Sequence, residues 1–453
     1  MIFIMMKRVF LIFLCFIFAQ AVYALDVVYP KKNEITVNSP TTIFVGSAVS
    51  PLTVNGKDAD IHPNGGFAYF VNLDEGENVF ELKDEQDVKI YKIIRKSPNN
   101  SSNYFNKLIE YGEKKYFTVK DDNSPLRSTP VDCGINRMAH LQKDIMLIVD
   151  GEKGNFYRVF LNDNKYAWID KKYVSPTEEF ENALISSFDF EEDDNYYNVY
   201  YHINKKVPYE IIEGSAITVN FYNTNNKSSF QFPYLGLSGS RKLIGYSGEY
   251  QGDDFVLKVR KPVYNDKHKP LKNLTITVDA GHGGSEIGAI GCLGDREKDI
   301  VLNVSKYLQH ELKKLGANVV MTRDEDVNVP LYDRVNIAND NDSSIFVSIH
   351  ANALPNTMNP LEHRGTSIYY YYNEAEPLAK SILKSMTEQL QTQDDKIRQG
   401  SFAVVRNTKA VSVLIEIAYL INPEDNALLI DTEFQKQCAK SIADGIANYI
   451  IEK

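Results

Sequence analysis

The amino-acid sequence predicts a multidomain protein in which all-β modules precede a carboxy-terminal α/β domain with a mixed sheet flanked by helices. Three observations predict this class. The chain of 453 residues exceeds one ordinary domain, since a domain takes roughly 100 to 200 residues. Residues 25–262 are rich in short β-forming runs separated by turns. After a linker at 262–272, strand-like runs alternate with segments of helical period, which is typical of an α/β domain.

The composition is that of a folded protein with an acidic balance. Hydrophobic residues make up 43% of the chain and charged residues 24%, both near the averages of globular proteins. The formal net charge of −10 argues against a nucleic-acid-binding protein, because contacts to phosphates need a basic face. We therefore expect no nucleic-acid partner.

Residues 1–24 have the pattern of a signal peptide. Lys7 and Arg8 precede an apolar run at 9–18, and small residues around Ala24 mark the expected cleavage site. The alternative is an uncleaved membrane anchor, but the apolar run is shorter than the roughly 20 residues that a span needs. We expect an exported protein of the periplasm or cell-wall space, with no transmembrane domain after cleavage.

The cysteines do not describe a disulfide framework. Beyond the signal, the chain has Cys133, Cys292 and Cys438, an odd and sparse count without any CxxC spacing. Whether Cys292 pairs with Cys438 is left open.

Residues 25–95 predict a small β-sandwich. Several short β-forming runs follow one another here, and Asn55-Gly56 between two of them is a strong hairpin signal. The segment resembles the immunoglobulin-like modules of bacterial surface proteins, for which scaffolding and ligand binding both remain open. A polar linker is expected at 96–104.

Residues 104–176 predict a second β module. Its turn at 126–130 comes early and its strand around Trp168 comes late. This order resembles the bacterial SH3-like barrel that often accompanies cell-wall hydrolases and helps to hold them to peptidoglycan. Trp168, the only tryptophan, is either a binding platform or a core residue, and we favour the core.

Residues 180–262 continue the β pattern in a third module. Strands are expected at 183–185, 197–201, 216–222 and 255–259, and the acidic run at 191–195 is interpreted as a solvated turn. The section loosely resembles the β-rich envelope-targeting modules that precede amidase domains, without a motif for any ligand.

Residues 272–453 predict the α/β domain. Apolar residues recur at helical spacing from 297 to 315, and Gly316 follows as a stop signal. We expect, in order, a strand before His282, this helix, a strand at 319–321, a short helix at 331–338, strands at 345–349 and 367–371, a helix carrying Leu378 to Leu390, a strand at 411–420 and a last helix from Phe434 to Ile450.

Four polar residues stand where this domain would place its chemistry. His282 lies in a glycine turn after a strand, His350 ends an apolar strand, Glu297 opens the first helix, and Glu416 interrupts an apolar strand. Open α/β sheets bind ligands at the carboxyl ends of their strands. Two imidazoles and a carboxylate suit catalytic zinc, because they leave one coordination position for water.

Glu416 is the candidate for proton transfer. Zinc lowers the pKa of bound water from about 15.7 to roughly 7 and polarises a carbonyl, but another group must accept and return the proton. A carboxylate in an apolar strand is costly to bury without a purpose. Each residue also has a structural alternative: Glu297 complements a helix dipole, His350 is a hydrogen-bonded core histidine, and Glu416 pairs with Arg406.

The motifs around these residues resemble one known family over essentially all of residues 273–453. That family is the zinc-dependent N-acetylmuramoyl-L-alanine amidases, known as the amidase-3 family. The motifs are DAGHGG with His282, GDREKD with Glu297, MTRDED with Arg323, LYDRVNIAN with Arg334, SIHANA with His350, FAVVR with Arg406 and VLIEIAYLIN with Glu416.

The resemblance implies one zinc ion, Zn2+, held by His282, Glu297 and His350, with Glu416 as the catalytic residue. The implied reaction is hydrolysis of the amide bond between the lactyl group of N-acetylmuramic acid and L-alanine in peptidoglycan, for cell-wall remodelling or cell separation. Glu416 would take a proton from water and return it to the alanine nitrogen. Arg406 and Asn352 contact either substrate or the protein itself, and Asp279 has a supporting or turn role.

Two other functions remain open from the residues alone. One is a catalytically silent wall-binding protein, and the other is a zinc peptidase that acts on the stem peptide. No motif identifies a protein regulator, so that partner stays unknown.

Two departures from the family pattern bear on function. The family usually has proline where Ala280 stands, a change that touches no ligand. Only the short segment 372–377 joins the strand at 367–371 to its helix, whereas some division-associated relatives carry a long helical insertion there that blocks the zinc. We expect this chain not to use that form of autoinhibition.

Overall fold

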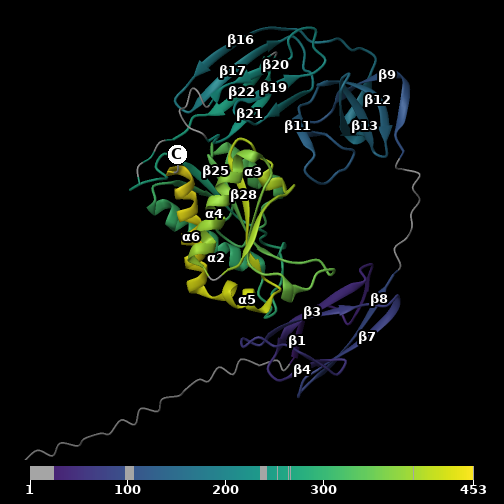
Figure 1. The fold of residues 1–453 in the computed structure, drawn as a ribbon, viewed down its shortest axis with the longest axis vertical. Helices are drawn as coiled ribbons and strands as arrows, with labels where there is room; N and C mark the ends of the chain where they lie inside the picture. The colour runs from purple at the N-terminus through teal and green to yellow at the C-terminus, as the bar shows by residue number, and fades with distance from the viewer. Residues whose placement is uncertain are drawn as a thin grey trace, which may run out of the picture.

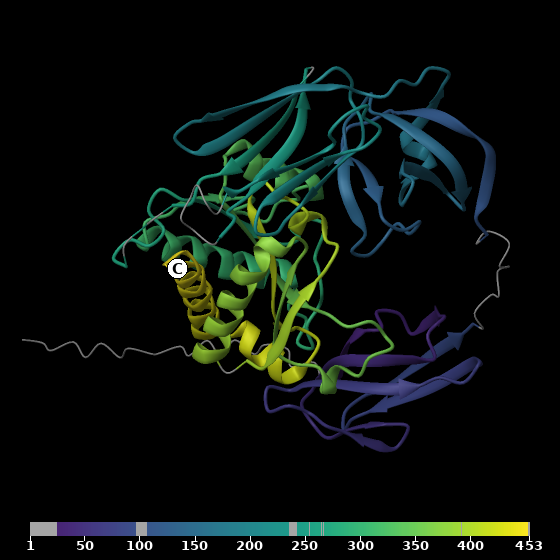
Figure 2. The same cartoon turned by 45° about the horizontal axis from the view of Figure 1, so that its top comes forward.

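The computed structural model describes residues 25–96, 107–234, 242–252, 254–263, 265, 267–390 and 392–451. The expected signal peptide at 1–24 and all but the first residue of the expected linker at 96–104 lie outside these residues. The described chain confirms the predicted class: all-β modules precede an α/β domain with a mixed sheet. Figures 1 and 2 show the β modules arranged around the α/β domain.

The first module consists of a three-stranded sheet, β1-β3-β6, and a five-stranded sheet, β2-β8-β7-β4-β5. Its core includes Phe44, Phe67, Leu82 and Ile93. The expected Asn-Gly hairpin joins β4 to β5. The strands are β1 Leu25–Tyr29, β2 Glu34–Val37, β3 Thr41–Ala48, β4 Leu52–Val54, β5 Lys57–Ala59, β6 Gly66–Asn72, β7 Gly76–Lys83 and β8 Val88–Arg95.

The second module is a seven-stranded antiparallel sheet in the order β11-β10-β14-β13-β12-β9-β15. The preference for Trp168 as a core residue was wrong, because strand alternation turns Ala167 and Ile169 inward and leaves Trp168 half-buried. The strands are β9 Ile109–Val119, β10 Ser124–Arg127, β11 Arg137–Leu141, β12 Met146–Lys153, β13 Phe156–Asn162, β14 Lys165–Asp170 and β15 Val174–Thr177.

The third module pairs a four-stranded sheet, β16-β17-β22-β21, with a three-stranded sheet, β18-β19-β20. Its apolar core is continuous with that of the second module. The interpretation of 191–195 as a turn was partly wrong, because Glu191 and Glu192 extend a strand whose residues beyond Ile185 face solvent. The strands are β16 Ile185–Glu192, β17 Tyr196–Ile203, β18 Tyr209–Ile212, β19 Ile217–Phe221, β20 Ser229–Phe232, β21 Tyr246–Gln251 and β22 Asp254–Arg260.

The α/β domain is built on a six-stranded sheet in the order β24-β23-β25-β28-β26-β27. Neighbouring strands are parallel, except that β26 runs antiparallel to β28. The main elements are β23 Thr275–Ala280, α2 Glu297–Lys314, β24 Asn318–Met321, α3 Leu331–Asp340, β25 Ile345–Asn352, β26 Thr366–Tyr370, α4 Glu376–Gln389, β27 Asp394–Gln399, β28 Val411–Tyr419, α5 Pro423–Ile430 and α6 Thr432–Ile451, with short 3-10 turns η3 Pro360–Glu362, η4 Asn373–Ala375 and η5 Ala403–Val405.

Helices cover both faces of this sheet. The larger core joins α2, α4 and α6 to side chains such as Ile276, Val347 and Ile415 on one face. A smaller cluster on the other face joins Phe346 and Leu414 to residues of α3 and η5. Because side chains alternate along a strand, each central strand turns every second residue toward α3 and η5.

Several details bear on the expectations from sequence. The thiols of Cys292 and Cys438 are free, so no bridge joins them. The segment between β26 and α4 is short, as expected, and forms η4. Among the described residues, we find no helix with the length and apolar character that crossing a membrane requires.

Candidate metal centre and active site

Strand register brings the polar residues of the sheet together. β23, β25 and β28 are parallel neighbours, with Asp279 opposite Ser348 and His350 opposite Glu416. Phe346 and Leu414, which lie four and two residues before His350 and Glu416 on their strands, pack on the α3 face. Alternation therefore directs Asp279, His350 and Glu416 to that same face, at the carboxyl end of the sheet.

The glycine turn after β23 carries His282 in the left-handed region of backbone space, at φ 58°. Such a conformation is uncommon for a residue with a side chain and persists where neighbouring contacts hold it. The residue before it is Gly281. Any other residue at this position would place a Cβ 2.3 Å from the ring of His350. Gly288 has φ 70°, and its Cβ would lie 2.4 Å from Glu297 Oε2. The glycines thus leave room for the histidine rings and the carboxylate.

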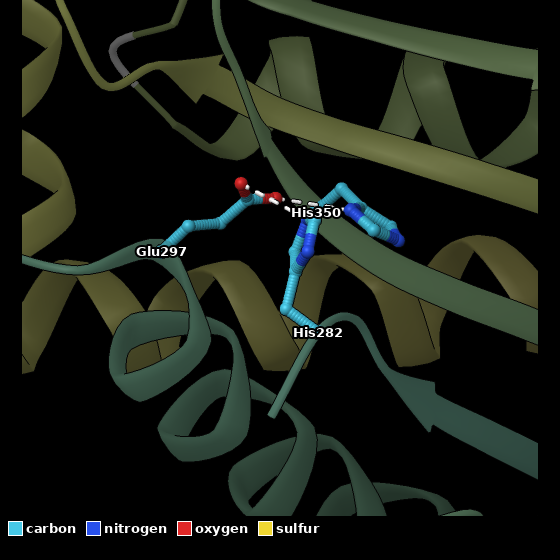
Figure 3. Close-up of side chains that lie close together, drawn as sticks. All are labelled: His282, Glu297 and His350. Carbon is cyan, nitrogen blue, oxygen red and sulfur yellow. Dashed lines mark hydrogen bonds and ion pairs between the residues drawn. The ribbon is translucent and has the colours of Figure 1, made fainter. Parts of the chain in front are cut away.

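Glu297 is the buried carboxylate between the two histidines. As Figure 3 shows, both rings turn toward it. His282 Nε2 lies 3.1 Å from Oε2, and His350 Nδ1 lies 2.9 Å from Oε1. The backbone N–H groups of Ala289 and Ala351 also donate to this carboxylate, at 2.8 and 3.1 Å. Glu297 starts α2, but its side chain faces the histidines rather than solvent.

The charges in the cluster are coupled. Burial acts to raise the pKa of Glu297, but the hydrogen bonds from His282 and His350 outweigh it and hold that pKa well below its usual range. Burial acts to lower the pKa of His350, and the hydrogen bond with Glu297 together with the charge of that carboxylate raises it overall. Glu297 is therefore an anion at neutral pH.

The arrangement fits a metal ion by its donor chemistry. One ligand atom each from His282, Glu297 and His350 lies within 4.8 Å of the other two. Imidazole nitrogens and carboxylate oxygens are the donor atoms that zinc binds together with cysteine sulfur. Two imidazoles and one carboxylate also leave one tetrahedral position open.

Glu416 lies beside this cluster without a neutralising partner. In the described part of the chain its Oε2 is shielded from water and has no hydrogen-bond partner. Burial raises the pKa of Glu416 to about 7; the charge of His350 opposes the shift and that of Glu297 adds to it. A carboxyl group with this pKa exchanges protons near neutral pH.

Arg406 does not neutralise Glu416. Within the described residues its Nη1 donates to the backbone and hydroxyl oxygens of Ser401. The ion pair considered from sequence is therefore not formed.

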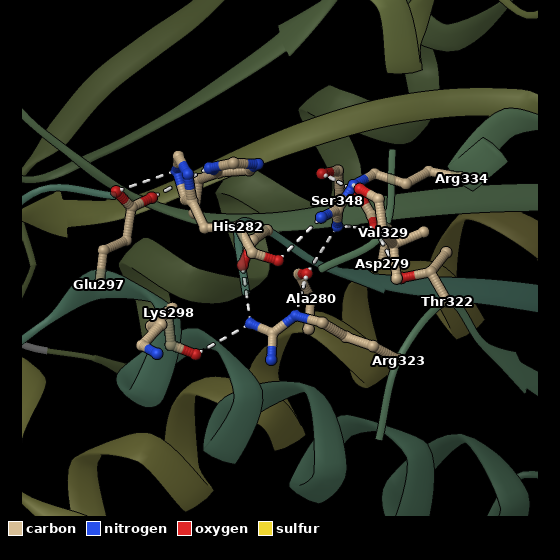
Figure 4. A network of polar contacts seen from close by, with 12 residues as sticks. Asp279, Ala280, His282, Glu297, Lys298, Thr322, Arg323, Val329, Arg334 and Ser348 are labelled. Carbon is tan, nitrogen blue, oxygen red and sulfur yellow. Dashed lines mark hydrogen bonds and ion pairs between the residues drawn. The ribbon is translucent and has the colours of Figure 1, made fainter. Parts of the chain in front are cut away.

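Two buried arginines hold the histidine turn in place (Figure 4). Arg323 donates to the carbonyl oxygens of Ala280, Gly281 and Lys298 at 2.7 to 2.9 Å. Arg334 donates to the carbonyl oxygens of Ala280 and His282, both at 2.8 Å. The turn that presents His282 is thus fixed through its backbone.

Asp279 is hydrogen-bonded within this network rather than to His282, Glu297 or His350. Its carboxylate accepts hydrogen bonds from Thr322 Oγ1, Arg334 Nη1 and Ser348 Oγ at 2.6 to 2.7 Å, and it is fully buried. A supporting role for Asp279 stays a prediction. The sequence motifs included Arg334 without giving it a role. One feature of the sequence indicates that Arg334 is buried. Arg334 and Ala338 are four residues apart, so both lie on the same, buried face of α3.

A pocket of about 450 Å³ opens beside the two histidines. Its lining combines apolar side chains with a nearly equal number of polar or charged ones. Arg406 and Asn352 do not line it, and Asn352 is half-buried at the end of β25. The lining residues are Asp279, His282, Glu286, Asn328, Val329, Pro330, Leu331, Arg334, His350, Phe402, Ala403, Val404 and Leu414.

Known proteins resemble this chain over the same α/β region. A family profile described as N-acetylmuramoyl-L-alanine amidase matches residues 276–448. The uncharacterised protein YqiI of Bacillus subtilis is 36% identical over 185 residues, which are 40% of this chain and 87% of that protein. The probable cell wall amidase LytH of Staphylococcus epidermidis is 34% identical over 182 residues, 40% of this chain and 60% of that protein. The match therefore spans less than two thirds of the length of this LytH protein.

A solved structure is also similar. The N-acetylmuramoyl-L-alanine amidase AmiC2 of Nostoc punctiforme is 36% identical and has a TM-score of 0.38, with 40% of this chain and 98% of that chain covered.

An α/β sheet with two imidazoles and a carboxylate gathered at its carboxyl edge defines an enzyme domain with a candidate metal centre. The chain belongs to the N-acetylmuramoyl-L-alanine amidase family, and its carboxy-terminal domain has the enzyme class of that family. The SH3-like assignment of 104–176 stays a prediction.

Proposed function

We propose that the protein is a zinc-dependent amidase that hydrolyses the bond between N-acetylmuramic acid and L-alanine in peptidoglycan. The observation that carries the proposal is the cluster of His282, Glu297 and His350 beside a pocket, with Glu416 on the neighbouring strand. Family membership supports the amide bond as the target. Zinc is supported by membership of this family together with two imidazoles and one carboxylate, a donor set that suits catalytic zinc.

The side chains divide the chemistry between them. His282, Glu297 and His350 would hold the zinc ion, which supplies acidification of a bound water and polarisation of the scissile carbonyl. Glu416 accepts the proton that the attacking water loses and delivers it to the alanine nitrogen as the amide bond breaks. No described residue forms a hydrogen bond with Oε2 of Glu416, which leaves this oxygen available for both transfers.

The place of action follows from the substrate. Peptidoglycan lies outside the cytoplasmic membrane, and the similar LytH protein is described as a probable cell wall amidase. We therefore propose export to the periplasm or cell-wall space, with the front modules holding the enzyme to the wall.

Metal content tests the proposed ligands directly. The purified chain should contain about one zinc ion, and His350→Ala should lose most of it because two donors seldom retain catalytic zinc. Glu416→Gln should keep its zinc, since Glu416 is not a ligand in this account. Equal zinc content in all three proteins would contradict the proposed ligand set.

A further inference from the structure

The first module covers segments of the α/β domain that adjoin the candidate metal centre. Ile43, Val45 and Ala68 of the module form a buried cluster with Cys292 and Ile421 of the α/β domain. Strand β6 of the module also contacts η3 and α5. Figure 1 shows the module beside α5, at that end of the α/β domain. The contact therefore joins two units that are far apart in the chain.

The three-stranded sheet of the module is covered on both faces. On β3, Phe44 belongs to the core of the module itself, whereas Ile43 and Val45 pack against the α/β domain. On β6, Phe67 and Ala68 divide in the same way. Because neighbouring side chains of a strand point to opposite faces, the second face adds nothing to the core of the module. Its apolar side chains are buried only by the α/β domain.

The first covered segment is the loop that leads to Glu297. Cys292 lies five residues before Glu297 and is fully buried. Its Sγ donates to Asn426 Oδ1 at 3.2 Å, and Asn426 Nδ2 donates to Asp295 Oδ2 at 2.8 Å. The N–H of Glu297 donates to the carbonyl oxygen of Ala289 at 3.0 Å. The module thus closes one side of a hydrogen-bonded loop that ends at a proposed metal ligand.

The second covered segment follows His350. Leu354, four residues after His350, packs against the same buried cluster. Asn356 adds two hydrogen bonds to the module. Its carbonyl oxygen accepts from Thr41 Oγ1, and its Nδ2 donates to the hydroxyl of Tyr29, both at 2.7 Å. The module therefore holds this segment through polar as well as apolar contacts.

The third covered segment follows Glu416. Ile421, five residues after Glu416, is part of the buried cluster. The N–H of Leu420 donates to the carbonyl oxygen of Asn352 at 2.9 Å, which links this segment to the end of β25. One face of the module therefore touches a segment next to each of two proposed metal ligands and a segment next to the candidate base.

Metal ligands next to loops need support from the packing around them. A functional geometry is kept when its residues are held within about 0.5 Å by neighbours that are themselves packed. Segments with few buried contacts open locally at a low cost in free energy. The segments next to Glu297 and His350 obtain buried contacts from the module through Cys292 and Leu354. Loss of these contacts therefore loosens the segments that set the distance between the two ligands.

We propose that the first module is a positioning element of the metal centre. By covering the three segments, it holds Glu297 and His350 at the spacing that a metal ion requires. The proposal rests on the proposed function and extends it, because it gives the first module a role in the amidase site. Undocking the module weakens metal binding although every ligand is still present.

Val45→Asp in the full chain tests this role. Val45 is 1% exposed and lies outside the core of the module, so the substitution buries an unpaired carboxylate only at the contact. We expect the zinc affinity, measured by competition with a chromogenic chelator, to fall roughly tenfold, as for residues that support metal ligands. Amide hydrogen exchange should rise in residues 286–297 and 351–359.

Three further variants control for charge and for folding. Val79→Asp makes the same change at an exposed position on β7 of the same module, and should alter neither zinc affinity nor exchange. Val45→Ala keeps the contact apolar and should retain most of the zinc affinity. Thr41→Val removes only the hydrogen bond to Asn356 and should raise exchange mainly in 351–359. This milder variant tests the contact even where Val45→Asp does not fold.

The outcomes separate the positioning role from the proposed function. Unchanged zinc affinity in Val45→Asp, together with faster proteolytic release of the first module, overturns the positioning role. An equal loss of affinity in Val79→Asp also overturns it, because the effect then does not come from the contact. A parent chain whose zinc affinity depends on Val45, but which releases no peptide from peptidoglycan, supports the positioning role and overturns the proposed function instead.

Discussion

At position 416 the chain places a carboxylate between Ile415 and Ile417, both fully buried, on the strand next to His350. Arg406, the most plausible partner by sequence, bonds to Ser401 instead. A group with these surroundings stays near its protonation midpoint at neutral pH, because burial raises its pKa to about 7. The environment of this one residue therefore suits a group that accepts and returns a proton.

Glu416→Gln tests this role with nearly constant side-chain volume. We expect amide hydrolysis to fall by roughly a hundredfold to ten-thousandfold, the usual contribution of a positioned acid–base group. Peptide release from purified peptidoglycan measures the effect. Near-normal turnover by this variant would remove Glu416 from the mechanism.

The pH dependence should report the same carboxyl group. Glu416 must be ionised to accept a proton, so the active fraction rises with pH through about 7 and falls as the pH drops below it. We expect kcat/KM to decrease about tenfold for each pH unit below that value. A rate that stays flat from pH 7 to pH 5 would be inconsistent with Glu416 as the base.

Three of the candidate site residues could be predicted from sequence because each interrupts a regular local pattern. His350 and Glu416 break apolar strands, and His282 stands among glycines. Arg323 and Arg334 were not given roles, because their hydrogen bonds reach backbone carbonyl groups about 25 to 55 residues away in sequence. Trp168 was misplaced because composition alone does not decide which face of a strand turns inward.

At the scale of elements, the end of β23 depends on one buried ion pair. Asp279 accepts from Arg334 Nη1 at 2.7 Å, and both side chains are buried. The same arginine holds the carbonyl of His282. The strand end and the turn that carries His282 are therefore coupled through α3.

Asp279→Ala should leave the guanidinium of Arg334 buried and unpaired. We expect a loss of roughly 3 to 5 kcal/mol in the free energy of unfolding, together with reduced zinc content. Thermal denaturation and metal analysis measure the two effects. Asp324→Ala, at an exposed position nearby, is the control and should change stability by less than about 0.5 kcal/mol. Equal stability of the two variants would contradict the proposed anchoring role.

The contact between the third module and η4 should depend on pH. Glu374 is buried, and neither carboxylate oxygen has a partner among the described residues. Burial, and then the charge of Glu213, raise its pKa well above the usual range. A pKa raised by folding means that stability is full below the unfolded pKa, about 4.3, and declines as the pH rises toward the folded value.

Glu374→Gln removes this titration. We expect the variant to be more stable than wild type at pH 8, by about 1 to 3 kcal/mol, with a smaller difference at pH 5. Denaturation midpoints at the two pH values measure the change. Glu388→Gln, on the exposed face of α4, should show no such pH dependence. A gain that is larger at pH 5 would contradict the sign of the shift.

Most helices and strands of the α/β domain could be predicted from the periodicity of apolar residues. Helix α2 ends at Lys314, one residue before the predicted end of that helix. β27 and α5 were not predicted. β27 has the polar sequence Asp394–Gln399 at the edge of the sheet, so it lacks an apolar signature. α5 is a short helix of eight residues that depends on the Asn422 cap and on packing.

At the scale of the whole molecule, the β modules pack against the catalytic domain rather than standing apart from it (Figure 2). Ile43, Val45 and Ala68 of the first module form a buried cluster with Cys292 and Ile421 of the α/β domain. On the third module, Arg260 forms an ion pair with Asp342 at 2.7 Å. The division of the chain into these units stays a prediction from sequence, and the contacts between them join residues far apart in the chain, for which the sequence has no local signal.

Gly66 should be essential for the contact of the first module. A Cβ at this position would lie 2.4 Å from Cys292 Sγ, which itself donates to Asn426. Gly66→Val should therefore destabilise the protein by about 1 to 3 kcal/mol through overpacking. It should also speed proteolytic release of the first module. Gly112→Val, where nothing lies within 4 Å of a Cβ, is the matched control. Identical proteolysis of both variants would contradict this contact.

The central claim is that this chain cleaves the amide bond between N-acetylmuramic acid and L-alanine with a metal held by His282, Glu297 and His350. Digestion of purified peptidoglycan by the full chain, followed by mass spectrometry of the products with and without a chelator, tests it most directly. We predict free stem peptides that begin with L-alanine, lost on chelation and restored by zinc. New termini within the stem peptide, or the same products in the presence of chelator, would contradict it.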